Sequence, residues 1–529
     1  MSTPVVEDNT AVPDGELSEI REEREWHRQA FGIILGLALG LLVYFVFPSN
    51  AAETVLQSSG ADPEVTYDAT NMRIVAAVTV WMAVWWMTEA IPLAATALIP
   101  IAVFPIAQVA EFKDVGAPYA SSTIFLFLGG FLLALGLQRW NVHRRIALGV
   151  VMIVGISPKR LILGFMIATG FMSMWVSNTA TAVVMLPIGI SVLSLTADTV
   201  GGWRHQKKFA TALMLAIAYS ASIGSLATLI GTPPNALLKG YMEEAHGITI
   251  GFGEWMMVGL PVAISFTIIA WLVLITVFKP EMDSIPGGKQ LIRDEIKKMG
   301  KWTTPQIIAT IIFVVAALTW VFLPLSRDHF GWDFTYDDAI VGIIAGLLMF
   351  TIPANGKTGV RILDWKTANE LPWDVLLLFG GGLALSSMFT KTGLSLWIGE
   401  KAKALEVLPT FLLIGAIAIL VLVLTEFTSN TATAATFLPI MGGVAVGIGL
   451  TGGEAGDMNV LLLTIPVALS ATCAFMLPVA TPPNAIAFGS GYVRIGDMIK
   501  GGIWLNLIAV VLITLATYFI AVPVFGLNI

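Results

Sequence analysis

Long apolar stretches alternate with short polar segments along almost the whole chain, after a polar leader at residues 1–28. A run of about 20 apolar residues is long enough to cross a bilayer as a helix. The apolar stretches lie near residues 29–48, 72–90, 92–110, 121–141, 161–197, 208–240, 256–279, 304–324, 338–354, 373–397, 409–450, 458–490 and 502–525. We predict that 29–48 is the first transmembrane helix and that the others form two sets of six.

The composition supports a membrane protein and narrows its partners. The chain has 529 residues, of which 56% are hydrophobic and 12% are charged, and its mean hydropathy is +0.82. A soluble domain carries roughly 25% charged residues, so we expect an all-α polytopic protein whose surroundings are the lipid bilayer. The chain has no basic tract of the kind that binds nucleic acid, so we expect no nucleic acid partner. The one cysteine, Cys473, excludes an intrachain disulfide.

Three short phrases occur twice at nearly constant spacing. The tripeptide Ser-Asn-Thr and a glycine-rich phrase recur 252 residues later, and Thr-Pro-Pro-Asn recurs 249 residues later. The pairs are 177–179 with 429–431, 127–130 with 379–382, and 232–235 with 481–484. Landmarks that recur in register predict an internal two-fold repeat. Repeat 1 covers residues 72–279 and repeat 2 covers residues 304–525.

Loop charges predict the side of the membrane that each segment faces, because cytoplasmic loops carry an excess of Lys and Arg. Segments 139–160 and 203–208 are basic and flank the stretch 161–197. About 37 residues are too few for two full spans, so we predict a re-entrant hairpin that enters from the cytoplasm. By the same reasoning, 409–450 is a hairpin that enters from outside.

The predicted architecture follows from these segments. It has 11 transmembrane helices plus two re-entrant hairpins, with the N-terminus in the cytoplasm and the C-terminus outside. Each repeat then contains an odd number of spans, so the two repeats are inverted relative to each other. Inverted repeats are common in secondary transporters, because they allow alternating access to one site.

The doubled Ser-Asn-Thr is predicted to lie at the tip of each hairpin. Polar groups at membrane depth are costly to desolvate and mark functional sites. Their hydroxyl and amide groups can donate to a carboxylate or accept around a cation. Two inverted tips that meet near the midplane would suit a dianion with a carboxylate at each end. The alternative is that these side chains only join helices, as polar residues often do in membranes.

The two Thr-Pro-Pro-Asn phrases are predicted to break their helices, because proline lacks an amide donor and suits the start of a helix. Thr232 and Thr481 are expected to cap the half-helices that follow. Freed carbonyls near Gly231 and Ala480 could bind a hard cation such as sodium. The alternative is a plain proline kink. Glu426, beside the second tip, is either a brace hydrogen-bonded to the hairpin backbone or a proton or cation site.

The paired phrases resemble those of the divalent anion:sodium symporter family, the INDY-type dicarboxylate transporters. The resemblance covers about residues 72 to 525. It implies a homodimer whose protomers have a scaffold domain and a transport domain that moves as an elevator. It also implies sodium as the co-transported ion and no organic cofactor.

The resemblance also assigns site residues. Sodium site 1 maps onto Ser173, Ser177, Asn178 and Gly231. Sodium site 2 maps onto Thr425, Ser429, Asn430 and Ala480. The substrate-binding positions are Ser177, Asn178, Thr179, Thr232, Pro233, Ser429, Asn430, Thr431, Thr481 and Pro482.

The function expected from the sequence is sodium-coupled import of C4-dicarboxylates, such as succinate, malate and fumarate, across the plasma membrane. A sodium-independent exchanger of the same fold, a citrate or sulfate symporter and an anion channel are the alternatives. The chain contains no P-loop, dinucleotide fingerprint, nucleophile elbow or zinc-protease motif. We therefore predict a protein that is not an enzyme.

Overall fold

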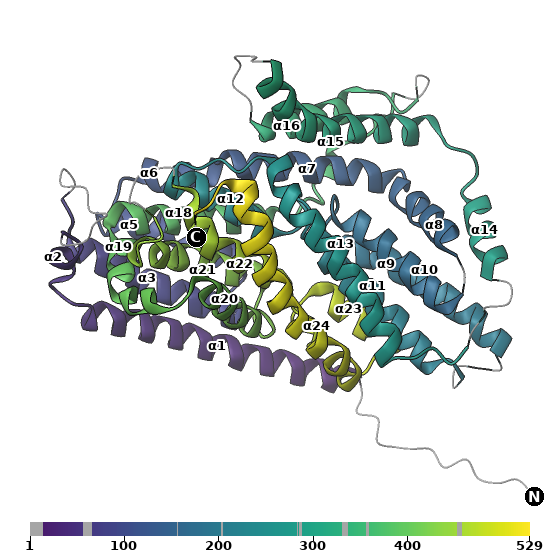
Figure 1. The fold of residues 1–529 in the computed structure, drawn as a ribbon, viewed down its shortest axis with the longest axis horizontal. Coiled ribbons are helices and arrows are strands. Elements are labelled where there is room, and N and C mark those ends of the chain that lie inside the picture. Colours follow the sequence, from purple (N-terminus) through teal and green to yellow (C-terminus); the bar gives the residue numbers. More distant parts are fainter. Residues whose placement is uncertain are drawn as a thin grey trace, which may run out of the picture.

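The computed structural model describes most of the chain as packed helices (Figure 1). The described residues are 14–56, 66–155, 157–200, 202, 205–282, 284, 288–330, 337–355, 359–451 and 457–528. Within these ranges there is no β-strand, and the only β-type pairing is an isolated bridge between Pro353 and Arg361. The prediction of an all-helical fold is thereby confirmed.

The chain begins with a long helix, α1 (Asp14–Val46), which packs along α3 (Ala69–Thr88) at the lower edge of Figure 1. The apolar stretch predicted at 29–48 is the second part of this helix and not a separate element. The short α2 (Ala51–Leu56) follows it. A continuous helix forms because no proline interrupts residues 14–46, so the polar and apolar parts share one axis.

The first set of helices extends from the segment after α3 to residue 277. Two short helices, α4 (Leu93–Thr96), which follows Pro92, and α5 (Ile99–Ile106), which contains two prolines, replace the single helix expected at 92–110. The rest of this set comprises α6 (Phe112–Gly116), α7 (Ser122–Arg139), α8 (Val142–Val154), α9 (Pro158–Ser173), α10 (Asn178–Val200), α11 (Lys207–Ser225), α12 (Pro233–His246) and α13 (Phe252–Val277).

The second set follows the same order of long, broken and short helices. It comprises α14 (Gly288–Lys298), α15 (Thr304–Phe330), α16 (Asp338–Thr351), α17 (Trp365–Ala368), α18 (Trp373–Thr392), α19 (Leu394–Ala402), α20 (Thr410–Thr425), α21 (Asn430–Gly447), α22 (Leu461–Thr472), α23 (Pro482–Gly489), α24 (Ile495–Ala516) and α25 (Val522–Phe525). By position, α9 to α12 correspond to α20 to α23. In Figure 1, α15 and α16 lie along the upper edge, across α7.

Seven helical segments in the described part of the chain are long and apolar enough to cross a membrane. An eighth is obtained if Leu394–Val407 and Thr410–Thr425, which meet at a bend of 119°, are taken together. Several other apolar helices are only 10–17 residues long, among them Asp338–Thr351. The total of 11 spans and the re-entrant character of the hairpins therefore stay predictions.

The two sets of helices interlock at the centre of the molecule. Helix α12 packs against α21 and α22 of the second set, and α23 packs against α10 and α11 of the first. Within each set, α9 packs on α11 and α20 packs on α22. The α9–α11 approach requires glycine, since a Cβ on Gly224 would lie 2.2 Å from the carbonyl oxygen of Gly170. The two half-helices that begin within the Thr-Pro-Pro-Asn phrases, α12 and α23, therefore each pack against the other set of helices.

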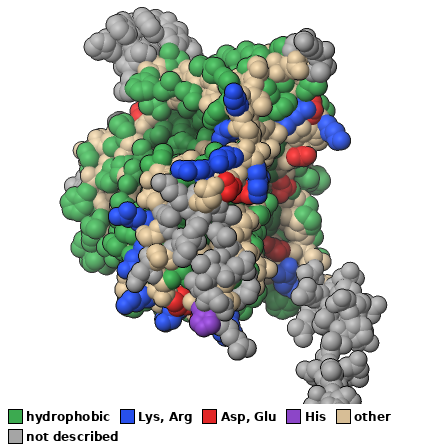
Figure 2. Space-filling model, turned by 90° about the vertical axis from the view of Figure 1, so that its right-hand side faces the viewer, with side chains coloured by type: hydrophobic (Ala, Val, Ile, Leu, Met, Phe, Trp, Pro, Cys, Tyr) green, Lys and Arg blue, Asp and Glu red, His purple; other side chains and the backbone are tan. Residues whose placement is uncertain are grey.

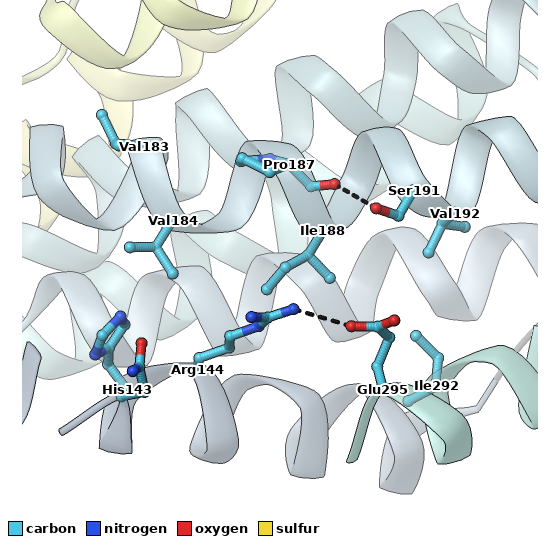
Figure 3. Close-up of a pocket in the computed structure, with 11 residues that line it drawn as sticks. His143, Arg144, Val183, Val184, Pro187, Ile188, Ser191, Val192, Ile292 and Glu295 are labelled. Atoms are coloured by element: carbon cyan, nitrogen blue, oxygen red, sulfur yellow. Dashed lines mark hydrogen bonds and ion pairs between the residues drawn. The ribbon is translucent and has the colours of Figure 1, made fainter. Parts of the chain in front are cut away.

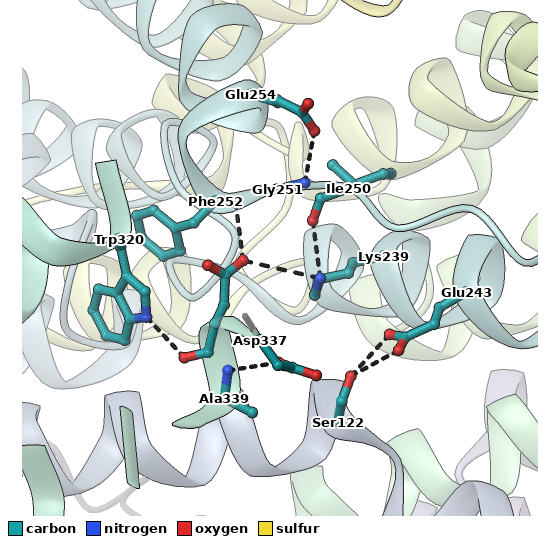
Figure 4. Close-up of polar contacts among 11 residues, drawn as sticks. Ser122, Lys239, Glu243, Ile250, Gly251, Phe252, Glu254, Trp320, Asp337 and Ala339 are labelled. Atoms are coloured by element: carbon teal, nitrogen blue, oxygen red, sulfur yellow. Dashed lines mark hydrogen bonds and ion pairs between the residues drawn. The ribbon is translucent and has the colours of Figure 1, made fainter. Parts of the chain in front are cut away.

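A buried ion pair joins α12 to α16 (Figure 4). Lys239 on α12 and Asp338 on α16 have side chains only 2% and 3% exposed, with 4.0 Å between Nζ and Oδ2. Lys239 also donates to the carbonyl oxygen of Ile250 at 2.9 Å, and Asp338 Oδ2 accepts from the backbone N–H of Phe252 at 3.0 Å. The Trp320 indole donates to the Asp338 carbonyl oxygen at 2.9 Å. The Lys239–Asp338 ion pair and its hydrogen bonds therefore connect α12 to the first residues of α13 and α16; this cluster is called the α12–α16 joint.

The surface shown in Figure 2 combines broad hydrophobic areas with Lys and Arg side chains at its centre, upper right and lower left. Apolar side chains on α15, such as Ile311, Val315 and Phe322, are 56–57% exposed. Large apolar areas facing outward are expected where lipid, rather than water, surrounds a helix. The exposed faces of α1, α13, α15 and α24 have the same character.

Candidate functional site

The first Ser-Asn-Thr lies where α9 ends and α10 begins. Residues 174–177, the first tip, are not helical, and Asn178 is the first residue of α10. The hydroxyl of Ser173, which is fully buried, donates to the carbonyl oxygen of Ala221 on α11 at 2.5 Å. Ser177 Oγ accepts from the backbone N–H of Ala180 at 3.2 Å, so it satisfies one free donor at the start of α10. The first tip is thus anchored to α11.

The second Ser-Asn-Thr repeats this geometry between α20 and α21. Residues 426–429, the second tip, are not helical, and Asn430 is the first residue of α21. The Thr425 hydroxyl lies 2.7 Å from the carbonyl oxygen of Ala471 and 2.8 Å from Oδ1 of Asn430. The Thr425–Ala471 bond corresponds to the Ser173–Ala221 bond of the first tip. Both tips are therefore held to the helix that precedes a Thr-Pro-Pro-Asn phrase.

An unwound segment, residues 226–232, follows α11; it is called loop 1 here. The Thr228 hydroxyl donates to the carbonyl oxygen of Met174, which connects loop 1 to the first tip. Asn235 Nδ2, on the first turn of α12, lies 3.4, 3.3 and 2.9 Å from the carbonyl oxygens of Ser225, Leu226 and Thr228. Asn235 is fully buried, so its amide satisfies carbonyls that the broken helix leaves free.

The matching unwound segment after α22, residues 473–481, is called loop 2 and begins with the buried Cys473. Asn484 Nδ2 donates to the carbonyl oxygens of Ala474 and Leu477 at 3.0 and 3.1 Å. The asparagine of each Thr-Pro-Pro-Asn phrase therefore bonds to the loop that precedes it. Our sequence-based prediction used the threonines and prolines of this phrase and assigned no role to its asparagines. Their occurrence at the same place in both copies of the phrase was the one indication of such a role.

Glu426, in the second tip, is fully buried and holds loop 2. Its two carboxylate oxygens accept from the backbone N–H groups of Phe475, Met476 and Leu477 at 2.8–3.2 Å. Asn506 on α24 donates to Oε1 at 2.5 Å. Glu426 is therefore a brace, but its partners belong to loop 2 and α24, and not to the hairpin backbone that the sequence led us to expect. Nothing in the sequence pointed to Asn506.

Loop 1 contacts the end of α22 through two threonines. Thr232, the last residue of loop 1, lies 3.4 Å from Thr472 of α22, measured between their hydroxyl oxygens. The predicted cap by Thr232 is wrong, because its side chain makes no capping hydrogen bond at the start of α12. The predicted cap by Thr481 is confirmed, since its hydroxyl accepts from the backbone N–H of Asn484 at 3.2 Å. Thr472 was not foreseen as a neighbour of the site.

The site residues expected from the sequence differ in how deeply they are buried. The tip residues Ser177, Asn178, Thr179, Ser429 and Asn430 are half-buried, as is Pro233. The residues behind them are buried, namely Ser173, Gly231, Thr232, Thr425, Thr431, Ala480 and Thr481, whereas Pro482 is exposed. Each tip bonds to its own set, and no hydrogen bond among the described residues joins one tip directly to the other.

Apart from the Glu426 carboxylate, which faces loop 2, the side chains of both Ser-Asn-Thr phrases offer neutral oxygen and amide groups. Hydroxyl, amide and backbone carbonyl oxygens suit a hard cation, and hydroxyl and amide hydrogens suit a carboxylate. Gly231 is required where it stands, because a Cβ there would lie 2.3 Å from the carbonyl oxygen of Ser225. Within the described ranges, no group of three or more His, Cys, Asp or Glu side chains could hold a metal ion.

A separate cavity of about 270 Å³ lies between α8, α10 and α14 (Figure 3). Its lining is mostly apolar and contains none of the expected site residues. Arg144 spans one wall and donates to Glu295 at 2.9 Å. The hydrogen bond from Lys298, together with Arg144, holds the pKa of Glu295 below its usual range. This ion pair docks α14 onto α8.

These features define a class of protein: a polytopic membrane transporter built on two sets of broken helices. A family model described as "Sodium:sulfate symporter transmembrane region" matches residues 67–526. The chain belongs to this family, the divalent anion:sodium symporters, as its paired phrases suggested. It is accordingly a transport protein and not an enzyme.

Two curated relatives carry the same description, "Sodium-dependent dicarboxylate transporter SdcS". The protein from Staphylococcus saprophyticus is 41% identical over 509 residues, which is 95% of this chain and 93% of that protein. The protein from Staphylococcus aureus strain USA300 is 43% identical over 464 residues, or 86% of this chain and 87% of that protein.

Two solved structures share the fold at low identity. The Alcanivorax borkumensis YdaH transporter is 14% identical, with a TM-score of 0.51, and the match covers 85% of this chain and 98% of that one. Neisseria gonorrhoeae MtrF is 12% identical, with a TM-score of 0.54, and the match covers 90% and 98%. At such identities the likeness shows the arrangement of helices alone.

Proposed function

We propose that this protein imports C4-dicarboxylates, such as succinate, malate and fumarate, together with sodium ions. The observation that carries the proposal is the pair of half-buried Ser-Asn-Thr tips, each anchored beside an unwound loop. A duplicated set of neutral donors matches a substrate with a carboxylate at each end. The relatives described as sodium-dependent dicarboxylate transporters support the same substrate and ion.

The proposed cation sites use one tip and one loop each. Sodium site 1 combines Ser173, Ser177 and Asn178 with the carbonyl of Gly231. Sodium site 2 combines Thr425, Ser429 and Asn430 with the carbonyl of Ala480. A sodium ion between tip and loop would offset the charge of a nearby carboxylate, because Coulomb attraction is strong where water is excluded.

The proposed substrate site lies between the two cation sites. One carboxylate would contact Asn178 and Thr179, with Thr232 and Pro233 nearby. The other would contact Asn430 and Thr431, with Thr481 and Pro482 nearby. Each half-helix, which starts at the first proline of a Thr-Pro-Pro-Asn phrase, would present its positive N-terminal end to the dianion. Ser177 and Ser429 would contribute to both kinds of site.

The proposed transport cycle is alternating access by an elevator movement. Sodium binds first and orders the tips, the dicarboxylate follows, and a transport domain carries both past a scaffold domain. We propose a homodimer in the plasma membrane, with the N-terminus in the cytoplasm and the C-terminus outside. The two halves, residues 72–279 and 304–525, would be inverted repeats with 11 spanning helices and two re-entrant hairpins.

The test is uptake of radiolabelled succinate into proteoliposomes that contain the purified protein. Uptake should require an inward sodium gradient and should proceed without internal dicarboxylate. Competition by unlabelled malate and fumarate, but not by citrate, sulfate or glutamate, would establish the substrate class. Uptake that needs internal dicarboxylate and ignores sodium would identify an exchanger and overturn the proposal.

A further inference from the structure

The asparagines of the two Thr-Pro-Pro-Asn phrases hold the loops of the proposed cation sites. Asn235 and Asn484 are both fully buried, and each directs its amide nitrogen at carbonyls of the loop before it. Carbonyls that bond to an asparagine are fixed in direction, and the short loop passes that constraint to its other carbonyls. The carbonyls of Gly231 and Ala480, proposed as sodium ligands, each belong to a residue four positions before the asparagine.

The two loops differ in what else holds them. Loop 2 has a second brace, the Glu426 carboxylate, which accepts three consecutive backbone N–H groups and is itself bound by Asn506. The residue that corresponds to Glu426 in the first tip is Met174, which has no carboxylate. There loop 1 is joined to the first tip by a hydrogen bond from Thr228 to the Met174 carbonyl oxygen. A neutral donor, the Trp255 indole, also bonds to the carbonyl oxygen of Leu226 at 3.1 Å, at the start of loop 1.

This difference has two physical effects. Three N–H groups of loop 2 and the Asn506 amide converge on the buried Glu426 carboxylate, and hydrogen bonds to a charged group are stronger than neutral ones. Loop 2 therefore keeps its shape even when one other bond is lost. In addition, the carboxylate follows Thr425 directly in the chain and adds negative charge near the second cation site alone.

We propose that Asn235 and Asn484 are positioning residues for the two cation sites, and that the sites are unequal. Site 2 is preformed, because Glu426 and Asn484 hold its loop independently, and it has the higher sodium affinity. Site 1 depends mainly on Asn235, and its loop is ordered by the ion that binds there. The part of this inference that concerns sodium rests on the proposed function; the unequal bracing does not.

The first experiment measures the sodium concentration that gives half-maximal succinate uptake. Asn235→Ala should raise this concentration about tenfold, the size of effect expected from losing a buried hydrogen-bonded group. Asn484→Ala should raise it less than threefold, because Glu426 still holds loop 2. Combining Asn484→Ala with Glu426→Gln should then raise it at least as much as Asn235→Ala does.

A matched control is Asn459→Ala. Asn459, itself buried, also donates its amide to a backbone carbonyl, that of Leu450 at 2.9 Å, but it lies at the far end of α22 from loop 2. This variant should leave the sodium concentration for half-maximal uptake unchanged. A merely structural role for Asn235 would lower the maximal rate and leave the sodium requirement as it was, and that result would overturn the inference. Equal shifts for Asn235→Ala and Asn484→Ala would also overturn it.

The second experiment tests the bracing without reference to sodium coupling. Backbone hydrogen exchange should be slower at Phe475, Met476 and Leu477 than across loop 1 in the purified protein. Glu426→Gln should accelerate exchange at these three amides, whereas Asn484→Ala should leave them protected. Unchanged exchange in Glu426→Gln would refute the brace. Sodium-independent uptake by the unsubstituted protein, with exchange as expected, would instead refute the proposed coupling alone.

Discussion

Asn178 and Asn430 each begin a helix directly after a tip, yet their side chains are engaged differently. Asn178 Oδ1 accepts from the backbone N–H of Thr179 at 2.8 Å, whereas Asn430 Oδ1 accepts from the Thr425 hydroxyl. The residue that corresponds to Thr425 is Ser173, at the end of α9, and among the described residues its hydroxyl bonds to Ala221 alone. Identical tripeptides therefore sit in two distinct hydrogen-bonding environments.

Replacing either asparagine by alanine should abolish succinate uptake, because each removes an amide that the proposed function assigns to both an ion and a carboxylate. The rate should fall by at least 100-fold, as losing two such interactions at about 1.4 kcal/mol per tenfold implies. The protein should still insert, which membrane fractionation checks. Uptake at the unsubstituted rate by either variant would contradict the assignment of the site.

Substitution of Glu426 by methionine, the residue found at the matching place in the first tip, should destabilise the fold. Three backbone N–H groups and the Asn506 amide would lose their acceptor in a buried place. Each buried unsatisfied donor costs about 1–3 kcal/mol, so the free energy of unfolding should drop by several kcal/mol. Thermal unfolding in detergent measures the effect. A melting temperature equal to that of the unsubstituted protein would show that the brace carries no stability.

Side-chain roles were predictable from the sequence only where the partner is local. Thr481 caps the helix that starts one residue later, and such a bond depends on neighbours in the chain. Thr232 occupies the same place in an identical phrase, but its hydroxyl lies beside Thr472, 240 residues away. Which of two partners a hydroxyl reaches depends on packing between the two sets of helices, and a sequence pattern contains no record of it.

At the scale of elements, a buried ion pair joins α12 to α16. Lys239 and Asp338 lie on helices that are far apart in the chain, and Asp338 also binds the first backbone N–H of α13. A negative group at a helix N-terminus is favourable. The joint thus links the half-helix that carries Asn235 to α16, which packs on α7.

Lys239→Met and Asp338→Asn should each destabilise the protein, and the double variant should recover most of the loss. Removing one partner of a buried ion pair leaves an uncompensated charge, which typically costs about 3–5 kcal/mol, whereas removing both is close to neutral. A double-mutant cycle on thermal unfolding measures the coupling. If the two single effects simply add in the double variant, Lys239 and Asp338 do not stabilise each other.

The positions of the helix breaks were largely predictable, but the packing of the helices was not. Proline at the start of α12 and α23, and polar residues in otherwise apolar runs at both tips, located the four breaks. The interlocking of α12 with α21 and of α23 with α10 has no such signal. An apolar run shows that a helix is buried without identifying the helix that covers it.

For the whole molecule, the predicted topology separates the two ends of α18. Lys366 lies before this helix and Glu406 lies after α19, and both side chains are exposed. In intact cells, a membrane-impermeant maleimide should label Glu406→Cys, while Lys366→Cys should react only after the membrane is opened. The reverse pattern would invert the proposed orientation. Labelling of both from outside would show that α18 does not cross the membrane.

The arrangement of the whole bundle depends on pattern more than on particular residues. YdaH and MtrF share it at 14% and 12% identity. Apolar runs, their lengths and a few breaks can be preserved while most side chains change, since any apolar residue of suitable size fills such a helix. For the same reason, composition and pattern indicated an all-helical membrane fold. The number of membrane-spanning helices does not follow from composition and pattern, because apolar helices such as α16 are shorter than a full span.

The chain has a single thiol, and it is the first residue of loop 2, with only 1% of Cys473 exposed. The thiol of Cys473 can therefore serve as a built-in reactive probe for the opening of loop 2. Alkylation by a membrane-permeant maleimide can proceed only when loop 2 opens, so its rate reports how often that happens. Sodium and succinate together should slow the reaction. No cysteine need be introduced or removed, and the loop can be timed in the unaltered transporter.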